Sequence, residues 1–122
     1  NDTAAIVLDL FQYMIGNTDW SSYGQHNMKV IQALAGNIPL AYDFDMTGLV
    51  DAPYATVNDA LSISSVKERL YRGYCRNESL VQYVRSEYLK NESDIVTLIK
   101  DHQSYLTPID FNGINPDYAL EK

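Results

Sequence analysis

The chain has 122 residues, the size of one ordinary domain, and 46% of them are hydrophobic, which is enough to build a core. Its formal net charge is −7 and its pI is near 4.5. An acidic surface repels phosphate backbones and anionic lipid headgroups, so this charge argues against nucleic acid or a membrane surface as a default partner. A small phosphorylated ligand remains compatible, because a bound metal or a local basic cluster can reverse the local field.

The single cysteine, Cys75, excludes an intramolecular disulfide and a cysteine-based zinc site, and we expect it to be semi-buried near a helix end. No apolar run approaches the roughly 18 residues that span a bilayer, so we expect no membrane insertion. The chain starts without Met, and it ends inside a predicted helix with Asn115 as cap and Pro116 at the first position. Both ends suggest a piece of a larger protein.

The first predicted element is a helix over residues 3–15. Asp2 or Thr3 can cap its start, and Gly16 can close its end. Its apolar residues recur at spacings of three and four and fall on one face: Ala4, Val7, Leu8, Phe11, Met14 and Ile15. Such a stripe is typical of a helix that packs on a core through that face.

A β-hairpin is predicted after a polar loop at residues 17–27. Two short apolar runs, 28–34 and 38–44, are separated by Ala35-Gly36-Asn37, and Gly-Asn favours a tight turn. Pro39 cannot donate a ladder hydrogen bond, which restricts the second run to an edge or a strand start. The hairpin is followed by an irregular connection over residues 45–64, a length typical of a functional or Ω-type loop.

The rest of the chain is predicted to be helical. Ser65 with Glu68 forms a capping box ahead of residues 66–74, and Ser79 with Gln82 forms a second box. A third apolar stripe is stopped by Pro108 and consists of Ile95, Leu98, Ile99, His102 and Leu106. The predicted fold class is therefore mainly α with a β component (α+β): a helical domain with one short hairpin.

The densest group of polar residues flanks this hairpin. Asn17, Asp19, His26 and Asn27 precede its first strand, and Asp43 and Asp45 follow its second strand. A hairpin brings its two ends together, so Asn27 and Asp43 should share one site. Carboxylate and amide oxygens suit Mg²⁺ or Mn²⁺, and a carboxylate that is not a ligand could accept a proton from an incoming hydroxyl.

The order of these residues resembles the C-terminal lobe of protein-kinase-like enzymes: a catalytic Asp, a metal-binding Asn, a hairpin, then a metal-binding Asp. The nearest patterns are those of the CotH-like kinases and the HipA-like and phosphoinositide-kinase-like families. The resemblance covers roughly residues 5–76 and points to a bacterial group related to the CotH-like kinases. Its motifs are Met14-Ile15-Gly16-Asn17-Thr18-Asp19-Trp20, His26-Asn27, Ala41-Tyr42-Asp43-Phe44-Asp45, Ala52-Pro53-Tyr54-Ala55 and Arg69-Leu70-Tyr71-Arg72-Gly73-Tyr74-Cys75-Arg76.

The resemblance implies a role for each matching residue. Asp19 corresponds to the catalytic Asp, and Asn27 and Asp43 correspond to the metal ligands. Asp45 would be a second ligand or a structural acceptor. One departure concerns spacing: Asp19 and Asn27 are eight residues apart, against about five in the usual kinase loop, and residues 21–24 look like an insertion.

The resemblance also implies Mg²⁺ (or Mn²⁺) and ATP as cofactors, with an unknown protein or small molecule as acceptor. The glycine-rich loop and the strand lysine would belong to an N-terminal lobe that this chain does not contain. The chain alone should therefore bind ATP weakly and catalyse nothing. The residues leave the compartment open, although the related bacterial group hints at export or the periplasm.

Several alternatives remain open. Asp19 could simply cap a turn, Asn27 could be a plain strand-entry residue, and His26 could be structural. Asp43 follows an apolar run, so we expect it to be partly buried and to need a partner. Arg72 lies in a predicted basic stripe with the arginines at 69 and 76, which would contact a cofactor phosphate or else form surface salt bridges.

At the level of the whole chain, the rivals of a phosphotransferase are a catalytically inactive kinase-like domain, a helical interaction domain, and a metal-dependent phosphoesterase that uses the same carboxylates. Metal binding would separate the first two from an active enzyme. Only the reaction products of the full-length protein would separate a phosphoesterase from a phosphotransferase.

Overall fold

The computed structural model describes the backbone of residues 1–105 and the side chains of residues 1–102, and this part of the chain has an α+β fold. Its elements are α1 (Asp2–Met14), β1 (Met28–Ala33), β2 (Gly36–Ala41), α2 (Glu78–Lys90) and α3 (Glu92–Tyr105). The predicted positions of Leu106, the stop at Pro108 and the helix at Asn115 and Pro116 lie outside the described residues.

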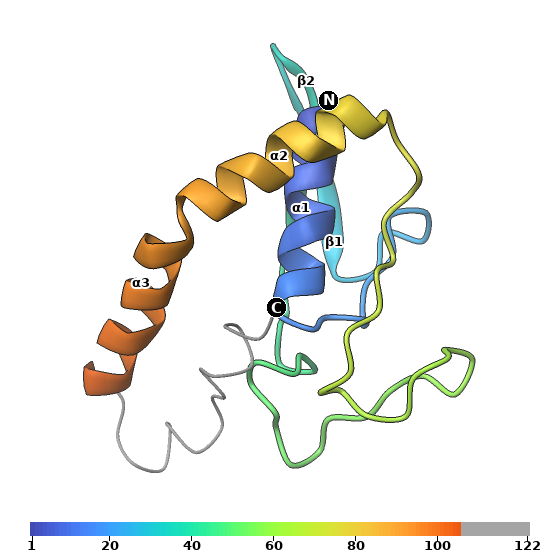
Figure 1. The fold of residues 1–122 in the computed structure, drawn as a ribbon. Helices are drawn as coiled ribbons and strands as arrows, with labels where there is room; N and C mark the ends of the chain where they lie inside the picture. Colours follow the sequence, from blue (N-terminus) through green and yellow to red (C-terminus); the bar gives the residue numbers. More distant parts are fainter. Residues whose placement is uncertain (106–122) are drawn as a thin grey trace.

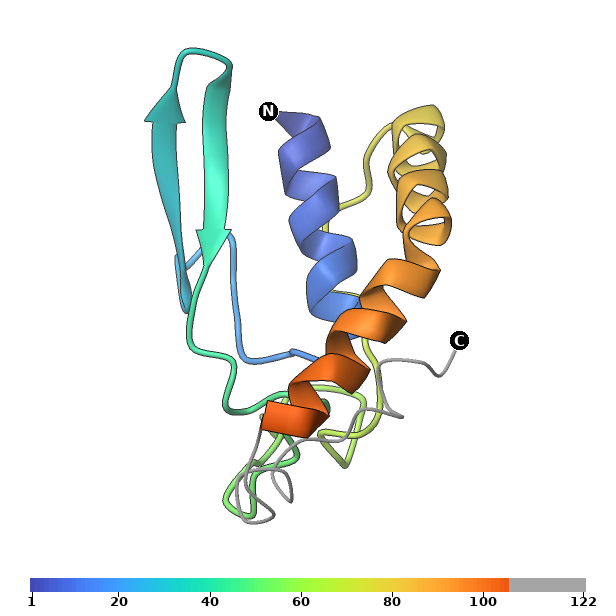
Figure 2. The same cartoon turned by 90° about the vertical axis from the view of Figure 1, so that its left-hand side faces the viewer.

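Helix α1 is the centre of the arrangement. It packs between the hairpin on one side and α2 on the other, and α3 leads away from the end of α2 (Figures 1 and 2). A long irregular chain joins the hairpin to α2 and returns along α1 (Figure 1). None of the helices within residues 1–105 is long and apolar enough to cross a membrane.

The first helix begins and ends close to the predicted positions. Its cap is Asn1, whose Oδ1 accepts the Ala4 amide at 3.1 Å, rather than Asp2 or Thr3. Gly16 ends the helix as predicted, with a φ of +68° that costs glycine little. Local hydrogen bonds therefore close both ends of the helix.

The fully buried face of α1 is not the predicted apolar stripe. Ile6, Asp9 and Gln12 are buried within the helix. Of the predicted stripe, Ile15 at the C-cap is buried and Val7 is 42% exposed, and the other members are half-buried. Asp9 can be buried because residues 69–76, which we call the arginine segment, pack against it and Arg76 places its guanidinium near its carboxylate. Gln12 is buried with a hydrogen bond from Asn17 Nδ2 to its Oε1. The apolar stripe lines surface hollows instead.

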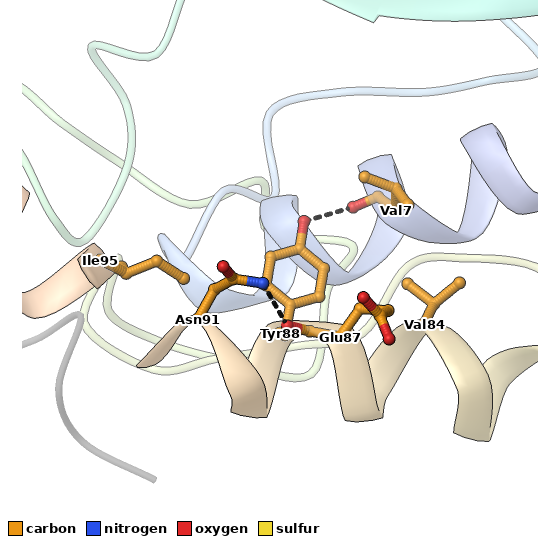
Figure 3. Close-up of a pocket in the computed structure, with 6 residues that line it drawn as sticks. All are labelled: Val7, Val84, Glu87, Tyr88, Asn91 and Ile95. Atoms are coloured by element: carbon orange, nitrogen blue, oxygen red, sulfur yellow. Dashed lines mark hydrogen bonds between the residues drawn. The ribbon is translucent and has the colours of Figure 1, made fainter. Parts of the chain in front are cut away.

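These hollows meet at Tyr88 of α2. One, of about 260 Å³, lies where α1 meets the junction of α2 and α3, and the Tyr88 hydroxyl donates a hydrogen bond to the Val7 carbonyl at 2.8 Å across it (Figure 3). A second, of about 340 Å³, is almost wholly apolar and extends past Phe11 to Phe44 and Ile99. The rings of Phe11 and Phe44 meet edge to face there, 5.8 Å apart.

The hairpin forms where it was predicted, but its turn is shifted. The two turn residues are Leu34 and Ala35, and Gly36 is already the first residue of β2, paired with Ala33. A φ of +101° at Gly36 lets the second strand start directly after the turn, which is the usual role of a glycine at this position. The second strand ends at Ala41, three residues earlier than predicted. Pro39 lies within it, in a two-stranded sheet whose strands are both edges.

The predicted helix at residues 66–74 does not form, and the chain is irregular from 42 to 77. Glu68 does not cap a helix through Ser65; its carboxylate accepts hydrogen bonds from the backbone and hydroxyl of Ser64, at 3.1 and 2.8 Å. The arginines that follow reach across to α1 and to the loop after it, and these tertiary contacts outweigh a modest local helix preference. Cys75, expected to be semi-buried at a helix end, is therefore exposed in an irregular segment.

The second and third predicted helices are present. Asn77 caps α2 by accepting the Leu80 amide at 3.2 Å, so the helix begins before the predicted Ser79–Gln82 box. Val84 is the buried residue of α2. Helix α3 carries the predicted stripe, and its Ile95, Leu98 and Ile99 line the larger hollow.

Candidate functional site

The loop that carries Asp19 is organised by a buried asparagine. Asn17 is 1% exposed, and its Nδ2 donates to Gln12 Oε1 of α1 at 2.7 Å. Its Oδ1 accepts the Asp19 amide at 3.0 Å, and its carbonyl accepts the indole N–H of Trp20 at 3.1 Å. Trp20 is buried, and its ring anchors the loop to the core. Asn17 therefore fixes the backbone that presents Asp19.

The extra residues between Asp19 and Asn27 form a closed side loop. Ser21 and His26 exchange two backbone hydrogen bonds of 3.1 Å, so residues 22–25 project from their common base. Because this bridge shortens the path, Asn27 Nδ2 donates both to the Asp19 carbonyl, at 2.8 Å, and to the Asp19 carboxylate, at 3.1 Å. The eight-residue spacing is thus compatible with direct contact between the two predicted site residues.

His26 belongs to this contact. Its Nε2 lies 2.9 Å from Asp19 Oδ1, and its side chain is 58% exposed rather than packed in the core. Asp19 therefore has a partner on each carboxylate oxygen, His26 on Oδ1 and Asn27 on Oδ2. Each oxygen retains a further lone pair, so the carboxylate can still accept a hydrogen bond from an incoming group.

The hairpin places Asp43 beside Asn27, as predicted. The Tyr42 amide donates to the Asn27 carbonyl at 3.0 Å, one step beyond the last strand pair, Met28 with Ala41. Asn27 and Asp43 both have left-handed backbones, with φ of +52° and +62°, a conformation that Asn and Asp tolerate better than other side chains do. Asp43 is exposed, so the expectation that it is partly buried is wrong: the second strand ends at Ala41, before Asp43 can enter the core.

The carboxylates of Asp43 and Asp45 lie close together at this end of the hairpin, and the charge of Asp19 also acts on Asp43. Hydrogen bonding to Asp45 and the charge of Asp45 raise the pKa of Asp43, with smaller contributions from desolvation and from the charge of Asp19. The Asp45 carboxylate also raises the pKa of the Tyr54 hydroxyl, mainly through a hydrogen bond to it. The site therefore holds like charges close enough to disfavour ionisation of Asp43, and a cation would relieve that repulsion.

The oxygen atoms at this site suit a hard cation. Within residues 1–105, no three or more His, Cys, Asp or Glu side chains form a ready-made metal cage. Mg²⁺, however, is usually held by only one or two carboxylates and completes its shell with water and phosphate oxygens. Asp43 and Asp45, with the Oδ1 of Asn27, would supply that limited number, and Asp19 is already engaged by its two neighbours.

The predicted basic stripe does not exist as a helix face, because residues 69–76 form no helix. The three arginines have separate partners. Arg76 forms the predicted kind of salt bridge, to Asp2 at 3.1 Å and more loosely to the buried Asp9 at 3.7 Å. Arg69 donates to the Met14 carbonyl at 3.2 Å. Arg72 donates to backbone carbonyls beside Asp19, and its contact with a cofactor phosphate stays a prediction.

Two residues at the site have partners that the sequence does not indicate. His26 belongs to the polar group that the sequence singles out, but only the Ser21–His26 bridge brings its ring to Asp19. Tyr54 lies in the motif Ala52-Pro53-Tyr54-Ala55, which signals a turn but does not indicate an interaction of its hydroxyl with Asp45.

Comparisons with protein-family models, with curated proteins and with solved structures find no match to this chain.

Proposed function

We propose that this chain is the C-terminal, metal-binding part of a kinase-like phosphotransferase that uses Mg²⁺ (or Mn²⁺) and ATP. The observation that carries the proposal is the meeting of Asp19, Asn27 and Asp43 at the open end of one hairpin. Asp19 and Asn27 are directly hydrogen-bonded, and the charge of Asp19 acts on Asp43. These are the residue types, in the same chain order, that protein kinases use for phosphoryl transfer.

Each residue has a defined task in this proposal. Asn27 Oδ1 and the Asp43 carboxylate would hold the metal, because the Asn27 amide nitrogen is already turned toward Asp19. Asp45 would be the second carboxylate of the ligand set. Asp19 would accept a hydrogen bond from the acceptor hydroxyl and so orient its oxygen for attack. When bound, the metal ion would neutralise charge on the phosphate oxygens.

A further part of the same protein would complete the site. By resemblance, the glycine-rich loop and the strand lysine come from an N-terminal lobe, and the acceptor is a separate protein or small molecule. Exposed apolar side chains on both faces of the hairpin are the surface that such a lobe would cover: Val30 on one face, and Ile31 and Leu40 on the other, with Leu34 at the turn. Exposed apolar patches commonly mark interaction surfaces.

The first test is metal binding by the ¹⁵N-labelled 122-residue chain. We expect Mn²⁺ at millimolar concentration to broaden the amide signals around Asn27 and Asp43. Asp43→Ala should abolish this effect, whereas Asp94→Ala, which removes the same charge from the exposed first turn of α3, should leave it intact. Mg²⁺ should compete with Mn²⁺ for the site.

Selective broadening at the hairpin end would justify adding ATP and the rest of the protein, followed by a search for a phosphorylated product. Broadening that is spread over the acidic surface, or lost equally in both variants, would contradict the site. If the full-length protein also bound neither metal nor nucleotide, an interaction domain with a kinase-like arrangement would be the better description.

A further inference from the structure

Arg72 contacts the backbone on both sides of Asp19. Its Nη1 donates to the Thr18 carbonyl at 2.6 Å and to the Trp20 carbonyl at 2.8 Å. These partners lie 54 and 52 residues earlier in the chain, so the contact depends on the tertiary structure. Hydrogen bonds from a guanidinium to a carbonyl are charge-assisted and are stronger than those between neutral groups.

This arrangement restricts the peptide that carries Asp19. One nitrogen can reach two carbonyls only when both point to the same side of the chain. The Asp19 amide is held separately, by Asn17 Oδ1 at 3.0 Å. With the flanking carbonyls and its own amide fixed, the carboxylate of Asp19 is left to face His26 and Asn27, where it is found.

The other two arginines of the segment do not share this role. Arg69 reaches the Met14 carbonyl, at the end of α1, and Arg76 reaches carboxylates on α1 itself. Arginine suits the position of Arg72 because its planar fork presents paired N–H groups in fixed directions, whereas the ammonium of lysine rotates freely and is more strongly hydrated.

We infer that Arg72 is a positioning residue, which directs the Asp19 carboxylate toward the candidate site by holding the two carbonyls beside it. The functional meaning of this inference rests on the proposed phosphotransferase site, but the positioning itself does not. Through Arg72, the irregular chain between the hairpin and α2 sets the geometry of a loop more than 50 residues away in the sequence.

The test compares Arg72→Met with Arg69→Met in the ¹⁵N-labelled 122-residue chain. Methionine keeps much of the side-chain length but has no donor, and Arg69→Met removes a backbone contact from the same segment without touching residues 18–20. The signals to follow are the Asn27 side-chain amide and the His26 ring nitrogens, since both groups bind Asp19. Their chemical shifts report the local hydrogen bonds directly.

We expect Arg72→Met to shift both sets of signals while the strand amides stay in place, and to weaken Mn²⁺ binding several-fold. Arg72→Lys should show a smaller shift in the same direction. Arg69→Met should leave the signals unchanged. Unchanged Asn27 and His26 signals in a folded Arg72→Met chain would overturn the inference, as would an equal shift in Arg69→Met.

If Arg72→Met does not fold, Arg72→Lys decides the question, because a folded lysine variant with wild-type signals would equally overturn the inference.

The proposed metal site and the proposed positioning role of Arg72 can be refuted independently of each other. A wild-type chain that ignores Mn²⁺ contradicts the metal site but leaves the signals of Asn27 and His26 as a valid readout. A chain that binds Mn²⁺ with no response to Arg72 contradicts only the positioning role.

Discussion

Replacing Asn17 with alanine should destabilise the fold far more than a surface asparagine would. The Asn17 side chain makes two hydrogen bonds, a buried one to Gln12 and a part-buried one from the Asp19 amide, and loss of the second costs about 1 kcal/mol net. Removing the side chain also leaves Oε1 of Gln12 without its hydrogen-bond donor. The Nε2 of Gln12 already has no partner among the described residues, and an unsatisfied buried group costs about 1–3 kcal/mol. We therefore expect the free energy of unfolding to fall by about 2–4 kcal/mol.

The measurement is urea denaturation followed by circular dichroism. With an m-value of about 2 kcal/mol/M, the midpoint should drop by about 1–2 M. Asn58→Ala is the matched control: Asn58 makes the same kind of turn, accepting the Ala60 amide at 2.9 Å, but it is exposed. Its loss should cost at most about 0.5 kcal/mol. Equal effects of the two substitutions would refute the view that burial of Asn17 organises the loop.

Two further predictions concern the packing of the arginine segment on α1. Gly73→Ala should lower the free energy of unfolding by about 1–3 kcal/mol in the same assay, because a Cβ at this position would overlap the Tyr71 hydroxyl and the Asp9 carboxylate. An effect no larger than that of Asn58→Ala would show that the two side chains can move aside. Burial raises the pKa of Asp9 despite the nearby Arg76, so the folded chain binds this proton more tightly than the unfolded chain does. Its contribution to stability is present below the unfolded pKa and is lost as pH rises through the folded pKa. Urea denaturation at several pH values should show this decline in the wild type and its absence in Asp9→Asn; parallel profiles would contradict it.

The sequence predicts the elements whose signals are local. The 3.6-residue period of α1, its closing glycine and the hairpin were identified correctly, because the side chains and backbone preferences that form them are close in sequence. The juxtaposition of Asn27 and Asp43 also follows from the hairpin alone. The residue types at the site were thus predictable, but not all of their partners.

The errors share a physical cause, which is contact over long sequence distance. The segment with Glu68 and Arg72 has local helix signals, yet its arginines bind carbonyls and carboxylates of the first 20 residues. The buried face of α1 carries Asp9 because Arg76, from far along the chain, lies near its carboxylate. No periodicity within a single helix contains that information.

The Ser21–His26 bridge makes the distance between Asp19 and Asn27 independent of their spacing in the sequence. Because two backbone hydrogen bonds close the base of residues 22–25, the number of residues in that side loop does not set the distance from Asp19 to Asn27. Lengthening a flexible loop twofold costs only about 0.6 kcal/mol, so this position can accept an inserted tag or fluorophore near its exposed Tyr23. A search pattern with a fixed gap between the two residues would miss chains that place them together in this way.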